Sequence, residues 1–226
     1  MMIKSHPGEG LLYQYAAGDV SAAMAIVVGT HVDMCKACRR TVCDIEQKLC
    51  EDNLDTIVNV ASNAMTKAQC DQMLEAIFES SVCSKLENEP NETLYLEGRC
   101  FTLPRTLAHN SHRIGEWSKL VGKLWRAPLT LDNGNQTNLI YMAPSAKVPE
   151  HTHKGQEATL VLDGVFNDER DEYRDGDFVL LDPSKTHTPE TREQDCLTLA
   201  TLDDPLHFTS GISRLLNPFS SLFFRA

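Results

Sequence analysis

The sequence lacks the features that mark several broad classes of protein. Its longest uninterrupted apolar run, Ala22–Val28, is far too short to cross a lipid bilayer. Its first residues, Met1–Pro7, contain no apolar segment of the kind found in signal peptides. Lys and Arg number 21 against 32 Asp and Glu, so the formal net charge is −11. The first two absences lead us to expect a cytoplasmic protein with no membrane contact. Because a phosphate backbone binds clustered cations, the acidic balance also leads us to expect no direct binding to nucleic acid.

The chain is long enough for two small domains, since 226 residues can bury more than one core. The acidic surplus is denser in the first half, where residues 1–99 contain 8 Lys and Arg against 15 Asp and Glu. An acidic module of this kind favours a basic protein partner.

Residues 8–83 have the spacing of apolar side chains that is typical of helices. A helix that follows Ser21 and runs to His31 is apolar nearly all round, so we expect it to be the most buried helix of a bundle. Gly18 is placed to end the helix before it. Two more helical faces follow, formed by Val42, Ile45 and Leu49 and then by Cys70, Met73, Leu74 and Ile77.

The polar segment Ser84–Thr93 contains a proline and is the natural boundary between two halves of the chain. We predict a helical half at residues 1–85, a linker at 86–99 and a sheet half at 100–226. The expected fold class is α+β: a small helical bundle followed by an antiparallel β-barrel.

The sheet half begins, in this prediction, with a short helical stretch around Trp117–Trp125. Turn signals follow at Asp132–Gly134 and Asp175–Asp177. The clearest strands are Thr137–Met142, Ala158–Leu162, Phe178–Leu181 and Leu197–Leu202.

Three residues with metal-ligand chemistry lie at the end of the predicted buried helix. His31 and Cys35 are four residues apart and share a helical face, and Cys38 lies one turn further or on the bend into the next helix. An imidazole with two thiolates is a ligand set that Zn²⁺ favours. His6 could complete a tetrahedron if the first helix packs antiparallel to the second. The alternatives are a buried cysteine pair beside a surface histidine, and a redox dithiol, although no strand precedes Cys35 as in thioredoxin-like units.

A second group of ligand-type residues lies in the sheet half. On a strand, His151 and His153 point to the same side, and Glu157 follows after a tight turn. His187 lies further along the chain, after the turn signal at Asp175–Asp177. Three imidazoles and one carboxylate suit Zn, Fe, Mn, Ni or Cu and leave positions for water or substrate. The alternative is a polar hairpin rim with scattered histidines.

The eight cysteines of a chain expected in a reducing compartment favour metal ligands and free thiols over a disulfide framework. Six of them lie outside the first ligand group, mostly at apolar helical or strand positions. We expect these six to pack in the core, with a redox-sensing thiol as the alternative: Cys43, Cys50, Cys70, Cys83, Cys100 and Cys196.

Taken together, these residues resemble the ChrR family of zinc-dependent anti-sigma factors, and the resemblance spans essentially the whole chain. The pattern His-x3-Cys-x2-Cys at residues 31–38 matches the zinc anti-sigma fold, and His6 stands where this family has an additional histidine ligand. The pattern His-x-His-x3-Glu at residues 151–157 matches the first motif of a cupin, and His187 matches the histidine of the second motif.

The resemblance implies a function that spacing alone does not. Family members inhibit a group IV (extracytoplasmic-function) sigma factor by wedging the helical domain between its two core-binding domains. The cupin is dispensable for inhibition but needed for release, for which the best-known signal is singlet oxygen. The resemblance implies Zn²⁺ in the helical half, and Zn²⁺ or another divalent transition metal in the cupin.

Two other functions compete with this interpretation. Cupins with three histidines and one glutamate include dioxygenases and isomerases, so the second group could belong to a metalloenzyme. We assign no catalytic residue, because no second carboxylate in the motif offers an acid or base. The other competitor is a metal or redox sensor that binds a different regulator. A homodimer through the sheet half is left open.

Overall fold

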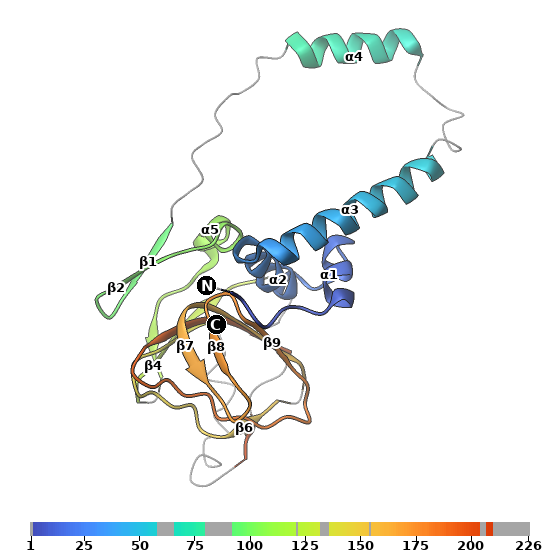
Figure 1. Cartoon of the computed structure of the whole chain (residues 1–226). Helices are drawn as coiled ribbons and strands as arrows, with labels where there is room; N and C mark the ends of the chain where they lie inside the picture. The colour runs from blue at the N-terminus through green and yellow to red at the C-terminus, as the bar shows by residue number, and fades with distance from the viewer. Residues whose placement is uncertain are drawn as a thin grey trace.

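The computed structural model describes residues 2–57, 66–79, 92–120, 122–131, 136–153, 155–203 and 207–209 (Figure 1). Helices come first in the chain and antiparallel strands follow, which confirms the expected α+β class. The helices are α1 (Glu9–Ala16), α2 (Ala22–Met34), α3 (Lys36–Ile57), α4 (Lys67–Glu79) and α5 (Arg105–His109), with a single 3₁₀ turn, η1, at Ser111–Arg113.

The central sheet has the strand order β3-β4-β5-β10-β7-β8, and β9 also pairs with β7. Two further pairs, β1 with β2 and β6 with β11, lie outside it. The strands are β1 (Thr93–Leu96), β2 (Arg99–Thr102), β3 (Ser118–Lys119), β4 (Leu124–Leu129), β5 (Gln136–Met142), β6 (His151–Thr152), β7 (Glu157–Asn167), β8 (Glu172–Arg174), β9 (Phe178–Leu181), β10 (Cys196–Leu202) and β11 (His207–Phe208).

Helix α2 is the central helix, as its all-round apolar sequence predicts. The hydroxyl of Ser21 accepts a hydrogen bond from the backbone N–H of Met24 at 3.2 Å and so caps the first turn. Val27 and Val28 are completely buried. The helix packs against α1, α3 and α5 and also against strands β7 and β10. It therefore joins the helical half to the sheet half by packing.

Helix α1 ends as predicted at Gly18, whose φ of +75° is the left-handed conformation that glycine adopts without strain. Helix α3 continues outward past α1 (Figure 1), so much of its length has no neighbour to bury it. Every residue of α4 is exposed, and this helix lies apart from the others in Figure 1. None of the described helices is both long enough and apolar enough to span a membrane.

The expectation that the remaining cysteines pack in the core is wrong for four of them. Cys196 is buried on β10, but the thiols on α3, α4 and β2 are exposed: Cys43, Cys50, Cys70 and Cys100. Helix α4 is exposed along its whole length, whereas on α3 and β2 the neighbouring Val42 and Phe101 are buried and the cysteines lie outside the covered face. Cys83 lies outside the described residues.

The four clearest strand predictions are confirmed, as β5, β7, β9 and β10. The predicted helical stretch around Trp117–Trp125 is wrong, because Trp125 lies in β4 and the short helix α5 precedes it. The helix-like spacing of Trp117, Leu120 and Leu124 is a coincidence. Strand β4 is buried on both faces, so its sequence lacks the alternation of apolar and polar residues that would have marked it as a strand. The turn at Asp132–Gly134 lies outside the described residues.

Strand β1 begins inside the range predicted as the linker and pairs with β2. Arg99 of β2 joins this hairpin to the sheet through Asp163 and Asp195, the latter at 2.6 Å. The exact division into 1–85, 86–99 and 100–226 stays a prediction.

Candidate metal centres

The first cluster of ligand-type residues, which we call centre one, consists of His6, His31, Cys35 and Cys38. His31 lies in the last turn of α2, and Cys35 ends that helix with an extended backbone at φ −108° and ψ 107°. This break turns the chain so that Cys38, in the first turn of α3, faces back toward His31. His6 comes from the segment before α1. The four possible ligand atoms all lie within 4.8 Å of one another.

The distances in centre one are those of a small tetrahedral cage. His31 Nε2 lies 3.3 Å from Cys38 Sγ, and His6 Nδ1 lies 3.4 Å from Cys38 Sγ and 3.5 Å from Cys35 Sγ. A tetrahedral zinc ion bound by imidazole and thiolate places neighbouring ligand atoms roughly 3.3–3.8 Å apart. The cluster is therefore able to hold a metal ion of this size.

The electrostatics of centre one also favour a cation. Burial lowers the pKa of His31 to about 4, which keeps its imidazole neutral and able to ligate at neutral pH. Burial and the hydrogen bond with Cys35 raise the pKa of the Cys38 thiol to about 12. A thiol in this position ionises only when a positive charge compensates it, and a bound divalent ion supplies that charge.

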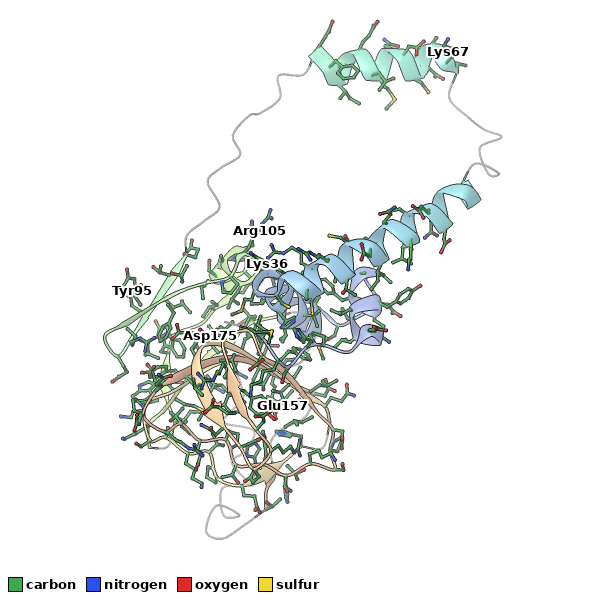
Figure 2. The ribbon with its side chains drawn as sticks, in the orientation of Figure 1. Lys36, Lys67, Tyr95, Arg105, Glu157 and Asp175 are labelled. Carbon is green, nitrogen blue, oxygen red and sulfur yellow. The ribbon has the colours of Figure 1, made fainter. Side chains whose placement is uncertain are left out.

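The second cluster, centre two, consists of His151, His153, Glu157 and His187, all of them buried. His151 lies on β6, His153 follows it, and Glu157 is the first residue of β7, labelled in Figure 2 within the sheet half. His187 lies between β9 and β10, and its backbone exchanges two hydrogen bonds with that of His151, at 3.1 and 3.2 Å.

Four lone-pair atoms converge in centre two. His187 Nε2 lies 2.9 Å from His151 Nε2, 3.4 Å from His153 Nε2 and 3.5 Å from Glu157 Oε2, and the Glu157 carboxylate also contacts His153 Nε2. Buried polar atoms crowded in this way are costly unless a cation or a proton sits among them. The donor set is thus able to hold a metal ion, as centre one is.

The carboxylates near centre two favour positive charge within it. Burial disfavours a charge on His187, but Asp168 and Glu157 outweigh burial and raise its pKa to about 9. Burial likewise opposes ionisation of Glu157, but hydrogen bonds with His153 and His187 hold its pKa well below the ordinary range. Burial and the neighbouring His187 lower the pKa of His151 to about 4.

Polar groups around centre two contact its side chains and orient them. His151 Nδ1 donates to the Pro149 carbonyl at 2.8 Å, so Nε2 faces inward. Thr159 Oγ1 donates to Glu157 Oε1 at 2.8 Å. The Asp168 carboxylate, 1% exposed, lies 3.8 Å from His187 Nδ1. Partners of this kind fix the tautomer and orientation of metal-binding imidazoles.

The structure therefore brings all eight sequence-predicted site residues together, in two groups of four. Their roles as ligands stay a prediction. The sequence interpretation missed three residues that lie around the centres. Asp168 lies beside His187, the Gly176 carbonyl lies 2.8 Å from His31 Nδ1, and Asp177 bonds to the backbone before His6. No spacing rule ties these residues to a centre. His109, His112 and His207 are exposed and join neither cluster.

Comparison with known proteins identifies the family. The ChrR cupin-like domain matches residues 109–204. The anti-sigma-E factor ChrR of Cereibacter sphaeroides is 32% identical over 226 residues, which cover 97% of this chain and 99% of that protein. The chain belongs to the ChrR family of anti-sigma factors. The resemblance inferred from the sequence is confirmed, and the ChrR relationship indicates a regulator rather than an enzyme.

A solved structure supports the ChrR assignment over most of the chain. It is the crystal structure of Rhodobacter sphaeroides SigE in complex with the anti-sigma ChrR. The match has a TM-score of 0.67 and 28% sequence identity, and it covers 89% of this chain and 100% of the chain it matches.

Proposed function

We propose that this chain sequesters a group IV (extracytoplasmic-function) sigma factor through its helical half and releases it under oxidative stress such as singlet oxygen. The observation that carries the proposal is the similarity, over nearly the full length, to a ChrR protein and to a ChrR chain solved with SigE. Because sigma factors act on RNA polymerase, the proposal places the chain in the cytoplasm. A homodimer and the absence of nucleic-acid and membrane partners stay predictions.

Helix α4 is the surface that best fits a protein partner. Met73, Leu74 and Phe78 are 54%, 50% and 83% exposed, and they lie on one side of the helix. A helix of this length is marginally stable by itself in water. A groove in a partner protein would cover the apolar side and stabilise the helix. The acidic residues of the helical half favour a basic partner surface around that groove.

We propose Zn²⁺ as the metal of centre one. Two thiolates and two imidazoles in a closed tetrahedron suit zinc and leave no coordination position for a substrate, as in structural sites. Centre two, with harder ligands, is proposed to bind Zn²⁺ or another divalent transition metal. When bound, each metal supplies positive charge and links segments that are distant in the sequence.

The two centres are proposed to divide the work. Centre one keeps α2, α3 and the segment around His6 in the arrangement that binds sigma factor. Centre two acts as the sensor. Oxidation of an electron-rich imidazole of centre two would remove a ligand lone pair and weaken metal binding, so an oxidant would change a fold that a metal helps to hold.

The test is capture of the partner by the full-length, zinc-loaded chain from a lysate of the source bacterium, followed by mass spectrometry. The expected result is one group IV sigma factor, whose transcription with purified RNA polymerase the chain then inhibits. Met73→Ser combined with Leu74→Ser should abolish capture. The matched control combines Gln72→Ser with Glu79→Ser on the opposite side of α4 and should leave capture unchanged. Capture that survives the first pair would contradict the role of α4, and failure to capture or inhibit any sigma factor would contradict the function.

A further inference from the structure

The segment Asp175–Asp177, which the sequence marks only as a turn, lies between β8 and β9 where the sheet half meets the helices. Figure 2 labels Asp175 at the edge of the sheet half that faces the helices, and the neighbouring Gly176 lies against Ile3 and Met34. The Asp177 side chain is 1% exposed. A carboxylate buried to this extent needs several hydrogen-bond donors, and the donors of Asp177 come from both halves of the protein.

Asp177 holds the chain immediately before His6. Its Oδ1 accepts hydrogen bonds from the backbone N–H groups of Lys4 and Ser5, at 2.8 and 2.9 Å. Its Oδ2 accepts from the N–H of Arg174 at 2.9 Å, which fixes the carboxylate within its own turn. The N–H of Phe178 returns a bond to the Ser5 carbonyl at 2.9 Å. Residues 4–5 are therefore fixed on the sheet half directly before a residue of centre one.

Gly176 holds the second imidazole of centre one. Its carbonyl lies 2.8 Å from His31 Nδ1, so Nδ1 carries the proton and Nε2 is free to face Cys38. The residue has φ +85°, and a Cβ at this position would overlap the side chain of Ile3. Glycine is thus required here both for the turn and for the close approach of the N-terminal segment.

The two thiols of centre one depend on the helical half instead. The N–H of Cys38 points at Cys35 Sγ, 3.5 Å away, across the junction of α2 and α3. The sheet half therefore contacts the His31 ring directly and holds the backbone before His6, whereas both thiols are positioned by the helices. Lys4 Nζ also contacts Asp171 and the Glu172 carbonyl, but the side chains of Lys4 and Asp171 are about half exposed, so their ion pair adds little.

We propose that the turn Arg174–Phe178 is the outer shell of centre one, and that Asp177 is its main positioning residue. The sheet half thereby sets how tightly the helical half holds its metal. The same turn leads into β9, whose last residue, Leu181, lies opposite Glu157 of centre two. A single short strand thus connects the two centres. This inference rests on the proposal that centre one binds a metal, but not on the identity of any partner.

The test is a Co²⁺ titration of the full-length chain in competition with a chelator. Of the two centres only centre one contains thiols, so the part of the thiolate-to-cobalt absorption band that Cys35→Ser combined with Cys38→Ser removes reports this centre. Asp177→Ala should weaken Co²⁺ binding in this band by about tenfold, the usual scale for a group that orients a ligand. Asp177→Asn, which keeps one acceptor oxygen, should weaken Co²⁺ binding by a smaller factor.

The matched control is Asp175→Ala, in the same turn. Asp175 is exposed, and its carboxylate accepts from the N–H of Gly164 within the sheet half. We expect this variant to bind Co²⁺ within about twofold of the parent chain, well inside the effect of a lost positioning group. Circular dichroism checks that each variant is folded; if Asp177→Ala does not fold, Asp177→Asn decides.

Each outcome has a separate meaning. Weakening by the Asp177 variants but not by Asp175→Ala supports the inference. Equal affinities for the parent and the Asp177 variants, or equal weakening by Asp175→Ala, would overturn it and leave the anti-sigma function intact, since the titration contains no sigma factor. A parent chain with no thiolate-to-cobalt band would overturn the inference together with the metal assignment of centre one.

Discussion

The two centres have the same number of ligand-type residues but are built in different ways. Centre two is held by backbone pairing, because His151 and His187 exchange hydrogen bonds and Glu157 begins the long strand β7. Centre one draws three residues from one helix junction and a fourth, the exposed His6, from a segment with no regular structure. Backbone pairing thus positions the residues of centre two, whereas the segments of centre one are joined by side-chain contacts such as those of Asp177 with Lys4 and Ser5. We therefore expect a bound metal to contribute more to holding centre one together.

The two halves also contribute unequally to the core. Leu139, Leu160 and Leu199 of the sheet form one buried cluster with Val27 and Val28 of α2 and with Cys35 and Cys38 of centre one. Helices α1 to α3 supply the smaller part of this cluster, and α4 supplies none of it. A small core gains much of its stability from a metal. We therefore expect metal loss to affect the helical half far more than the sheet half.

The largest effect should follow removal of both thiols of centre one. Cys35→Ser combined with Cys38→Ser should abolish metal binding there and also abolish sigma binding, because a structural zinc ion contributes on the order of 10 kcal/mol to folding. Metal content by mass spectrometry and a sigma pull-down measure this. Cys43→Ser combined with Cys50→Ser changes two exposed thiols on α3 and should leave both properties unchanged. A Cys35/Cys38 variant that still inhibits sigma would show that metal does not hold this half together.

A smaller and more selective effect is expected in centre two. His151→Ala should remove the metal from this centre, leave sigma binding intact and slow the release of sigma by oxidant at least tenfold, on the scale that ligand-shell changes have. Release is measured as recovery of sigma-dependent transcription after singlet oxygen is generated. His112→Ala, at an exposed histidine outside both centres, is the control. Loss of sigma binding in His151→Ala would mean that the two centres do not divide the work.

The outer shell of centre two should matter less than its ligands. Asp168→Asn removes the negative charge beside His187 Nδ1, so the affinity for Zn²⁺ should fall by about tenfold. Competition with a chelator measures this affinity. The Asp168 change is made in a chain that also has Cys35→Ser and Cys38→Ser, so that centre one binds no metal and only centre two is measured. Asp182→Asn, at an exposed carboxylate that bonds only within its own turn, should have no effect. An unchanged affinity would exclude Asp168 from the shell.

The smallest expected effect is on the free energy of unfolding, through a hydrogen bond that involves neither centre. Tyr141 OH donates to Asp195 at 2.9 Å, and burial together with this bond raises the pKa of Tyr141 to about 12. Since the folded-state pKa lies above the ordinary value near 10, this stabilisation is complete below pH 10 and is lost as the pH rises toward 12. Tyr141→Phe should cost about 1 kcal/mol in urea unfolding at pH 8. The difference from the parent should shrink above pH 10; a constant difference would contradict the pKa assignment.

Local sequence patterns were sufficient to predict several parts of this structure. The spacing of His31, Cys35 and Cys38 across a helix end, and of His151 and His153 along a strand, follows from helical and extended periodicity. Gly18, Ser21 and the strand Phe178–Leu181 were predicted by the same kind of local reasoning, and the structure contains each as predicted. The family resemblance also rests on such local patterns, because they carry ligand chemistry at fixed spacing.

Only the tertiary structure decided what surrounds these patterns. Nothing local indicates that Asp168 lies beside His187, or that Asp177 holds the residues before His6 from more than half the chain away. Helical spacing predicted apolar faces on α3 and α4 but not that their cysteines would be exposed. The physical reason is that periodicity determines which side chains share a face. Whether that face is covered, and by which distant segment, depends on how the whole chain packs.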